Sequence, residues 1–580
     1  MDSDLKNKFA SEGEKSMEDI EKINKKRNNE SYLLVADNKY TIPNNVNEVL
    51  ESNEKEQWLQ AMKAELDAFK EFGVYEKVKI KDITAPLIKG RWVYSVKDEL
   101  NVPDIFKSRL VAKGFTQEVG QNYLDTYSPV INGETIRFLL ALAAINGWEI
   151  HQLDAKNAFL NGKLENEIYF KPPPMCKTKK DEAWLLKKAI YGLKNAPLIF
   201  YKTFSETLIK CGFTVSKINP CLIYHEKLEV YVALYVDDLL VVGSSIKNIN
   251  KAKDIIKSKF VMKDMGEPKM FLGMNIKRVN KNHIKISMKS TLERIQQSHG
   301  VKVPMRKIKT PLAKGFDRFD EKSEKLNEEE HHKYRSLIGK LLHIANNVRL
   351  DISFAVSILS RHLQTPRKCH LAAAQRVLQY LIQTKNKGIH FTKYKYKKMK
   401  SIDYRVVSSN KKQIIFDYGK KRDYEIRAVT DASYGNEENK KSQYGYIVML
   451  NDNVISWASK KQSSISLSTA EAEYVGMSEA AKTTLYFRNL IKELNMKTGP
   501  GVICSDNIAA LQMSAIRTIS SKTKHIEIRF YHIQDCVKKR KLKLEYVNTT
   551  ENIADGLTKI LDGSTNSKLN KLIFSNHKET

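Results

Sequence analysis

The stretch from Tyr231 to Gly243 constrains the fold most, because two apolar runs of strand composition are interrupted by the adjacent carboxylates of Asp237 and Asp238. Val, Leu and Tyr pack well on a pleated sheet, and a Gly-Ser-Ser cluster ends the second run, so the pattern favours two strands over a helix. It predicts a β-hairpin whose tip carries both acids. Two neighbouring carboxylates in apolar surroundings repel each other and lose hydration, unless a cation neutralises them.

A divalent metal ion would be such a cation. Carboxylates suit Mg²⁺ or Mn²⁺, and a pair of these ions can activate the attacking oxygen and stabilise the leaving oxygen of a phosphoryl transfer. An isolated Asp-Asp pair is more often a plain surface turn. Here a third acid, Asp154, opens the segment Asp-Ala-Lys-Asn-Ala-Phe-Leu-Asn-Gly earlier in the chain, and this context favours the metal site.

The segment at Asp154 and the tetrapeptide Tyr-Val-Asp-Asp at 235–238 resemble the palm of reverse transcriptases from copia-type LTR retrotransposons, which carry D-x-x-x-A-F-L-x-G followed by Y-V-D-D. The resemblance implies that Asp154, Asp237 and Asp238 are the catalytic metal ligands of a polymerase site. That site would hold two Mg²⁺ or Mn²⁺ ions.

Residues 90–97 and 107–115 alternate apolar and basic side chains, which predicts two short strands with cations on one face that can reach phosphates. A solvated basic face would have the same pattern. The second segment resembles the family's R-L-V-A-K-G-F sequence in the fingers, and this implies that Arg109, with Lys107 or Lys113, contacts the incoming nucleoside triphosphate.

Two aromatic residues join this expected nucleotide site through the resemblance. Phe159 stands in the Asp154 motif where reverse transcriptases carry a ring that excludes a ribose 2′-hydroxyl, although outside that motif it would be read as a core residue. Tyr191 begins Tyr-Gly-Leu-Lys-Asn-Ala-Pro, which resembles a turn into a helix that supports the nucleotide and template. This copy has Asn195 where the family usually has Gln.

The remaining polymerase region is expected to be largely helical. Apolar residues recur at helical spacing between Trp58 and Phe69, between Tyr334 and Ala345, and between Leu371 and Leu381, which predicts three helices packed on a core. Another apolar helix is expected at 136–145. Residues 271–274, Phe-Leu-Gly-Met, resemble the primer-grip strand.

A second set of acids follows in four segments, each at a strand end or helix start, with short strands expected at 428–430, 444–450 and 502–505. The segments resemble the signatures S-D-A, S-S-T-x-E-A-E-Y, C-D-N and A-D-[IG]-x-T-K of the copia-type ribonuclease H domain. The resemblance implies a second site with two metal ions and four catalytic ligands: Asp431, Glu473, Asp506 and Asp555.

Glu471 and Glu473 cannot both face this site, because two residues on a helix are about 200° apart. Glu473 shares a face with Met477 and Ala480, which predicts that Glu473 is the ligand and leaves Glu471 as the alternative. His525, in a segment that resembles the family's T-K-H-I, either assists substrate handling or caps a helix.

The net charge of +31 indicates a polyanionic partner, although a lysine-rich genome would also contribute to it. The six cysteines lack C-x-x-C spacing and are expected to be reduced, with no zinc site. No apolar run is long enough to span a membrane, so we expect a protein that is neither secreted nor membrane-spanning. The protease motif D-[ST]-G is absent from the chain.

The sequence therefore predicts a multidomain α/β (α+β) enzyme. The expected parts are a flexible charged arm (1–45), polymerase fingers and palm (46–275), a thumb and connection (276–390), a basic linker (391–425), a ribonuclease H-like domain (426–562) and a tail (563–580).

Its expected function is RNA-directed DNA synthesis with cleavage of the RNA strand of RNA–DNA hybrids. The expected partners are an RNA template, a DNA primer, the hybrid and dNTPs, with integrase and capsid proteins of the same element, in a cytoplasmic virus-like particle or the nucleus. One alternative is a catalytically inactive remnant that only binds nucleic acid, but all seven acids are retained. The other is a non-retroviral polymerase or helicase accessory, which the ribonuclease H signatures disfavour.

Overall fold

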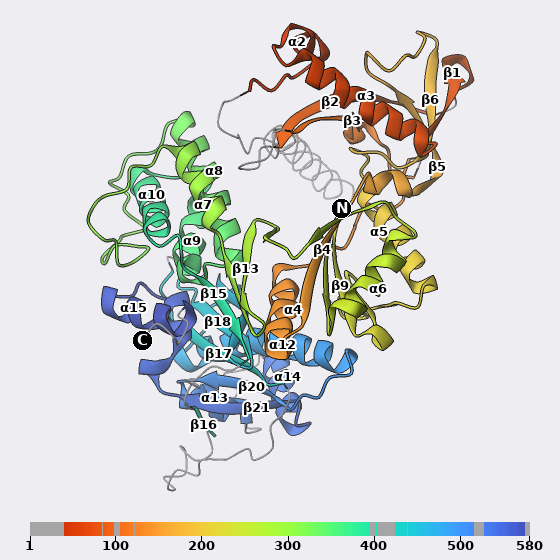
Figure 1. Ribbon diagram of the computed structural model, residues 1–580. Helices are drawn as coiled ribbons and strands as arrows, with labels where there is room; N and C mark the ends of the chain where they lie inside the picture. The colour runs from red at the N-terminus through yellow and green to blue at the C-terminus, as the bar shows by residue number, and fades with distance from the viewer. Residues whose placement is uncertain are drawn as a thin grey trace, which may run out of the picture.

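The computed structural model describes residues 40–83, 85–97, 105–120, 122–393, 401–403, 424–437, 439–515 and 527–574. These residues form an α/β molecule with four sheets. In Figure 1 the N-terminal region lies at the top, the helices of residues 289–383 (green) stand opposite it, and the C-terminal region (blue) lies below. No helix in the described part is long and apolar enough to cross a membrane.

The N-terminal region, the fingers, is a five-stranded sheet with helix α3 packed on it and helix α2 packed on α3. Trp58 on α3 packs edge-on against Tyr94 and Phe106 of the sheet, and Met62 and Phe69 continue the buried stripe, which confirms the predicted helix. The elements are α2 (Val46–Glu51), α3 (Lys55–Glu71), β1 (Tyr75–Lys79), β2 (Leu87–Lys97), β3 (Ile105–Ala112), β5 (Lys163–Lys171) and β6 (Glu182–Lys188), with strand order β1-β6-β5-β2-β3.

The palm is a six-stranded sheet built around the predicted hairpin. Strands β9 and β10 pair antiparallel, and Val236 and Asp237 form the turn between them, so the hairpin is confirmed. The elements are α4 (Gly133–Asn146), β4 (Glu149–Ala155), α5 (Ala196–Lys210), β7 (Thr214–Val215), β8 (Leu222–His225), β9 (Val230–Tyr235), β10 (Asp238–Gly243), α6 (Ile246–Lys257) and β11 (Met262–Gly266), with strand order β11-β4-β10-β9-β8-β7.

The thumb region combines four helices with a small sheet, and two of these helices confirm the predicted apolar stripes. Its elements are β12 (Met270–Phe271), β13 (Met274–Asn280), β14 (His283–Ser287), α7 (Lys289–His299), α8 (Glu328–Asn347), α9 (Ser353–Leu359), α10 (Lys368–Gln383) and β15 (Gly388–Thr392). The expected primer-grip strand is instead a hairpin: Leu272 and Gly273 both have positive φ and form the turn between β12 and β13, as two-residue hairpin turns require.

The C-terminal domain is a six-stranded mixed sheet with order β16-β21-β20-β17-β18-β19, and it contains all three predicted strands. Helix α15 and strand β16 were not predicted; they lie in residues expected to be a tail and a linker. The elements are β16 (Ser401–Asp403), β17 (Ile426–Ser433), β18 (Gln443–Leu450), β19 (Asn453–Lys461), α12 (Thr469–Glu493), β20 (Gly501–Ser505), α13 (Ile508–Ala515), α14 (Glu527–Lys538), β21 (Leu542–Val547), the 3-10 turn η9 (Ile553–Leu557) and α15 (Gly563–Phe574).

Palm and C-terminal domain share one core through helix α4, whose residues 135–145 are all buried. Arg137 lies with its guanidinium 4.0 Å from the ring centre of Trp457 and donates to the carbonyls of Ile455, at 2.7 Å, and of Asn346 and Asn347. One buried cation therefore ties the palm to the end of α8 and to strand β19. A buried guanidinium is stable only when its donors are satisfied in this way.

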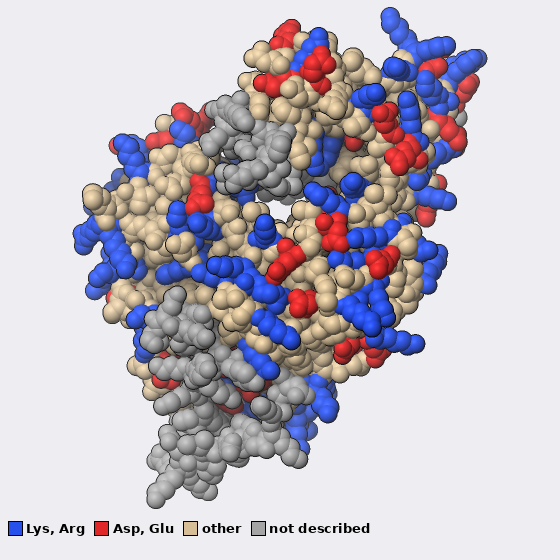
Figure 2. Space-filling view, viewed as in Figure 1, with Lys and Arg blue, Asp and Glu red and all other residues tan. Residues whose placement is uncertain are grey.

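Charge and cysteine chemistry agree with the expectations from composition. Figure 2 shows Lys and Arg side chains in many places on the coloured part of the visible face, as expected for a net charge of +31. All six cysteines are free thiols. Four of them are buried, and burial raises the pKa of Cys176, Cys221 and Cys504 to about 12, so these three are poor nucleophiles.

Candidate active sites

The three palm acids lie at the turn end of the hairpin. The register of β4 and β10 places Asp154 directly opposite Asp238, and Asp237 occupies the turn. Cβ atoms of such opposite residues lie about 5 Å apart. Asp238 accepts a hydrogen bond from Nε2 of Gln152 at 3.2 Å. Gln152 was not predicted, although it shares a strand face with Asp154 two residues away.

The surroundings of Asp237 shift its pKa. Burial raises its pKa, the charge of Asp154 raises it further, and the charges of Arg109 and Lys107 lower it. A cation between Asp154 and Asp237 would relieve the repulsion that this shift reports. The predicted acids therefore lie at one end of the hairpin: Asp154 is opposite Asp238 and close enough to Asp237 to raise its pKa, and Asp238 is bonded to Gln152.

Three of the four predicted nucleotide residues form a continuous group beside the hairpin. The guanidinium of Arg109 lies 5.0 Å from the ring centre of Tyr191, and the ring of Phe159 meets Tyr191 edge-on at 4.7 Å. Burial raises the pKa of Tyr191 to about 12, and Asp237 is close enough to contribute to this rise. The group therefore adjoins the acids.

Glycines allow the segments that carry this group to approach closely. Gly192 has φ +90°, and a Cβ there would lie 2.2 Å from the carbonyl oxygen of Ala112. The N–H of Ala112 donates to the carbonyl of Tyr191 at 2.8 Å, which fixes the end of β3 beside Tyr191. Lys113 follows directly and donates its own N–H to the carbonyl of Lys89. Its contact with a triphosphate stays a prediction.

Glu65 on α3 is a charged neighbour that sequence reasoning missed. Its carboxylate accepts the N–H of Leu110 at 3.2 Å. Burial raises its pKa to about 6, against the lowering effects of that hydrogen bond and of Arg109. The sequence did contain a signal, because Glu65 lies three residues after Met62 and four before Phe69, inside the apolar stripe of the helix.

The second site lies where the pairing between strands β17 and β20 ends. These strands are parallel with Val429 opposite Cys504, so Asp431 and Asp506 follow at equivalent positions. Ligand atoms of Asp431, Glu473 and Asp506 all lie within 4.8 Å of one another, the only such group of three among the described residues. Adjacent ligands of an octahedral Mg²⁺ ion lie about 3 Å apart, so small side-chain movements would let these three share an ion.

Electrostatics at this site also favour a cation. Burial raises the pKa of Asp431 to about 7, and Asp555 adds to the rise against the opposite effect of Lys559. Burial, followed by Asp431 and Asp506, raises the pKa of Glu473 well above its ordinary value. Its Oε2 atom is buried without a hydrogen-bond partner, which is costly for a carboxylate unless a ligand satisfies it.

Glu471 instead makes hydrogen bonds at the start of helix α12. Its Oε2 accepts the N–H of Leu467 at 2.8 Å, and its own N–H donates to Oγ of Ser468 at 3.2 Å. Both bonds satisfy groups at the start of α12, as capping residues do. The structure therefore places Glu473 with the other acids and Glu471 at the helix cap, as the helical period predicted.

Asp555 stands beside the group of three rather than within it. It forms an ion pair with Lys559 at 3.0 Å, and the same ammonium lies 3.9 Å from Asp431. Thr558 also donates a hydrogen bond to Asp431. Lys559 had no predicted role, although its position four residues after Asp555 is a helical ion-pair spacing. His525 lies outside the described residues.

The region that holds the palm acids matches a known protein family. Residues 72–314 match the family model "Reverse transcriptase (RNA-dependent DNA polymerase)". The chain is 32% identical to the retrovirus-related Pol polyprotein of transposon TNT 1-94 from Nicotiana tabacum, over 91% of this chain and 38% of the relative.

Two further relatives agree. The chain is 31% identical to the Pol polyprotein of transposon RE1 from Arabidopsis thaliana, over 87% of this chain and 33% of the relative. It is 27% identical to the transposon Ty1-ER2 Gag-Pol polyprotein of Saccharomyces cerevisiae, over 88% of this chain and 28% of the relative. The chain thus spans between 28% and 38% of the length of these relatives. It belongs to the Pol polyproteins of copia-type retrotransposons and contains their reverse transcriptase domain.

Proposed function

We propose that the chain is an RNA-directed DNA polymerase that copies retrotransposon RNA into DNA with two divalent metal ions, and that its C-terminal domain cleaves the RNA strand of RNA–DNA hybrids. The observation that supports polymerisation best is the register of β4 and β10, which sets Asp154 opposite Asp238 beside the turn that carries Asp237. The description of the matching family model supports the same activity.

The donor sets fit divalent cations. The charge of Asp154 raises the pKa of the partly buried Asp237, and Glu473 and Asp555 each have a buried carboxylate oxygen without a hydrogen-bond partner. Oxygen-only ligands of this kind suit Mg²⁺ or Mn²⁺. When bound, such ions would lower the pKa of the attacking oxygen and stabilise charge on the reacting phosphate at both sites.

The other residues would position the substrate. Arg109 and Lys107 lie close enough to affect Asp237, so their charges would attract a triphosphate to the side of the hairpin where the acids are. Phe159 would limit the space beside the sugar. At the C-terminal site, the positive charge of Lys559 offsets the negative charges of Asp431 and Asp555. Lys559 would also orient these two carboxylates towards a substrate phosphate.

A primer-extension assay on poly(rA)/oligo(dT) with Mg²⁺ tests the proposal, run beside a hybrid-cleavage assay. We expect the wild-type chain to be active in both. Asp237→Asn should abolish extension, by a factor on the order of 10³ or more when a ligand at the reacting centre is lost, while hybrid cleavage persists. Asp254→Asn, at an exposed acid of palm helix α6, is the matched control and should retain both activities.

Two outcomes would contradict the proposal. Extension by Asp237→Asn at the wild-type rate would remove the hairpin from the polymerase site. A wild-type chain that binds primer–template but neither extends nor cleaves it would support the alternative of an inactive nucleic-acid-binding remnant.

A further inference from the structure

A cleft lies between the thumb region and the C-terminal domain. It has a volume of about 370 Å³, within the range of small-molecule sites. One wall is the thumb segment 312–319 with Phe354 and Ile358 of α9, and the facing wall is formed by Thr558, Lys559 and Ile560. The cleft is therefore shared by two regions that the chain order separates widely.

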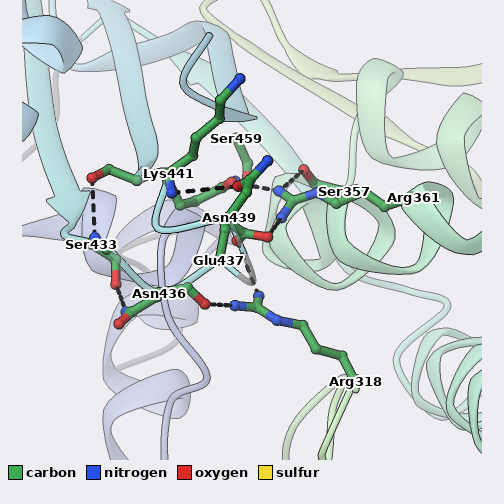
Figure 3. A network of polar contacts seen from close by, with 12 residues as sticks. Arg318, Ser357, Arg361, Ser433, Asn436, Glu437, Asn439, Lys441 and Ser459 are labelled. Carbon is green, nitrogen blue, oxygen red and sulfur yellow. Dashed lines mark hydrogen bonds and ion pairs between the residues drawn. The ribbon is translucent and has the colours of Figure 1, made fainter. Parts of the chain in front are cut away.

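The loop after β17 is fixed to the thumb at the base of this cleft (Figure 3). The carboxylate of Glu437, which is only 5% exposed, forms ion pairs with Arg318 and Arg361. Arg361 also donates to Oε1 of Gln443 at 2.5 Å, and Arg318 donates to the carbonyl of Asn436. Two thumb cations thus satisfy one buried acid, which fixes the loop after β17 against the thumb wall of the cleft.

The second wall of the cleft is also the edge of the acidic site. Thr558 donates to Asp431, and Lys559 pairs with Asp431 and Asp555. Both residues line the cleft as well. A molecule in the cleft would therefore lie directly beside the group that Asp431, Glu473 and Asp506 form.

The lining suits a nucleotide. Phe319 is 40% exposed, and the guanidinium of Arg318 lies 4.8 Å from its ring centre. With Arg318 over the ring, an exposed part of Phe319 remains for a nucleobase to stack against, and such stacking is worth roughly 1 to 3 kcal/mol. The ammonium of Lys559 on the facing wall would attract the phosphate of the same nucleotide.

We propose that this cleft binds a ribonucleotide of the RNA strand next to the bond that the acidic site cuts, with its base against Phe319 and its phosphate towards Lys559. The inference rests on the proposed hybrid cleavage. The RNA strand is the occupant rather than the DNA strand because the cleft shares its wall with the acids that would act on RNA. The thumb then takes part in choosing where the RNA is cut.

Fluorescence of 2-aminopurine in the RNA strand tests the inference. The full chain is mixed with hybrids that carry one 2-aminopurine ribonucleotide at successive positions, with Ca²⁺ in place of Mg²⁺ to prevent cleavage. We expect the emission to change at one or two adjacent positions only. Phe319→Ala should abolish that change, and Phe319→Tyr should keep it. Met305→Ala, at a fully exposed side chain of the same connecting segment, should leave it unaltered.

Cleavage in Mg²⁺ supplies the second measurement. Phe319→Ala should raise KM for the hybrid about five- to a hundredfold by the loss of one stacked base and leave kcat and primer extension unchanged. A position-specific emission change without any cleavage by the wild-type chain would refute the proposed nuclease but support the cleft. Cleavage by a wild-type chain whose emission is the same at all positions, or is unaffected by Phe319→Ala, would overturn the cleft as a nucleotide site.

Discussion

Phe159 shows how one side chain can decide between two substrates. The ring is 8% exposed and is held edge-on by Tyr191, which in turn contacts Arg109, so it cannot easily move away from a 2′-hydroxyl. We expect Phe159→Ala to raise incorporation of rNTPs relative to dNTPs on the order of tenfold, as for other steric selections of one small group. The ratio of kcat/KM values measures this effect. Phe115→Ala, at a 58% exposed ring, is the control, and an unchanged ratio for Phe159→Ala would leave the ring a core residue.

Glu65 should make the stability of the fingers depend on pH. Burial raises its folded-state pKa from 4.5 to about 6, so the folded state holds the proton more tightly than the unfolded state. Its favourable contribution is complete below about pH 4.5 and is lost as the pH rises through about 6, at most ~2 kcal/mol. Glu65→Gln should therefore raise the Tm above pH 6 and leave it unchanged near pH 4.5. Glu71→Gln, at an exposed position of the same helix, should show no such difference. A lower Tm for Glu65→Gln at pH 7 would instead mean that Arg109 needs the ionised carboxylate.

Residues differ in how far the sequence could predict them. The acids were predictable because each stands in a short motif at a strand end or helix start. Gln152, Glu65 and Lys559 were missed although each has a local signal, since each also contacts a residue far away in the sequence: Asp238, Leu110 and Asp431, respectively. Such contacts depend on the fold and not on local pattern.

Helix α12 decides which glutamate serves the second site. Its register turns Glu473 towards Asp431 and Asp506, while Glu471 bonds to the N–H of Leu467. Glu473→Gln should abolish cleavage of the RNA strand and leave primer extension intact. Glu471→Gln should keep most cleavage, because glutamine still accepts a hydrogen bond at the cap, with a stability loss below about 1 kcal/mol. The comparison of cleavage rates is the measurement. Loss of cleavage in Glu471→Gln alone would mean that the register is shifted by two residues.

Helices whose apolar residues recur with the helical period could be predicted from the sequence. Short or polar elements could not. Helices α3, α8 and α10 each bury a regular apolar stripe, which the sequence alone displays. Helix α15 has few apolar residues, and they become buried because the thumb covers them. The thumb contacts the helix at two places: Asn570 donates to the hydroxyl of Tyr380 at 3.3 Å, and Arg349 lies over the ring of Phe574. Strand β16 has three residues and depends on β21 for its pairing.

At the scale of the molecule, the sequence predicted separate polymerase and nuclease domains, and the structure joins them through one hydrophobic cluster. Phe138 of α4 stacks on Phe487 of α12 at 5.4 Å. Asn219 donates to the hydroxyl of Tyr486 at 3.0 Å, so polar contacts extend the same interface. Independent domains usually meet through smaller and more polar surfaces. This contact is therefore part of the fold of the palm.

A chain that ends at residue 393 should test this dependence. Without the C-terminal domain, α4 would expose Phe138, and Arg137 would lose the carbonyl of Ile455 and the ring of Trp457. Exposed apolar surface costs about 25 cal/mol per Å², and the buried cation would lack part of its hydrogen bonding. We expect the truncated chain to have a lower Tm, to bind a hydrophobic dye, and to extend primers at less than about a tenth of the full-length rate. Glu473→Gln in the full chain is the control, because it should remove nuclease activity without exposing α4. If the truncated chain matched this control in Tm and extension rate, the palm would fold independently, and the shared core would contribute nothing to its stability.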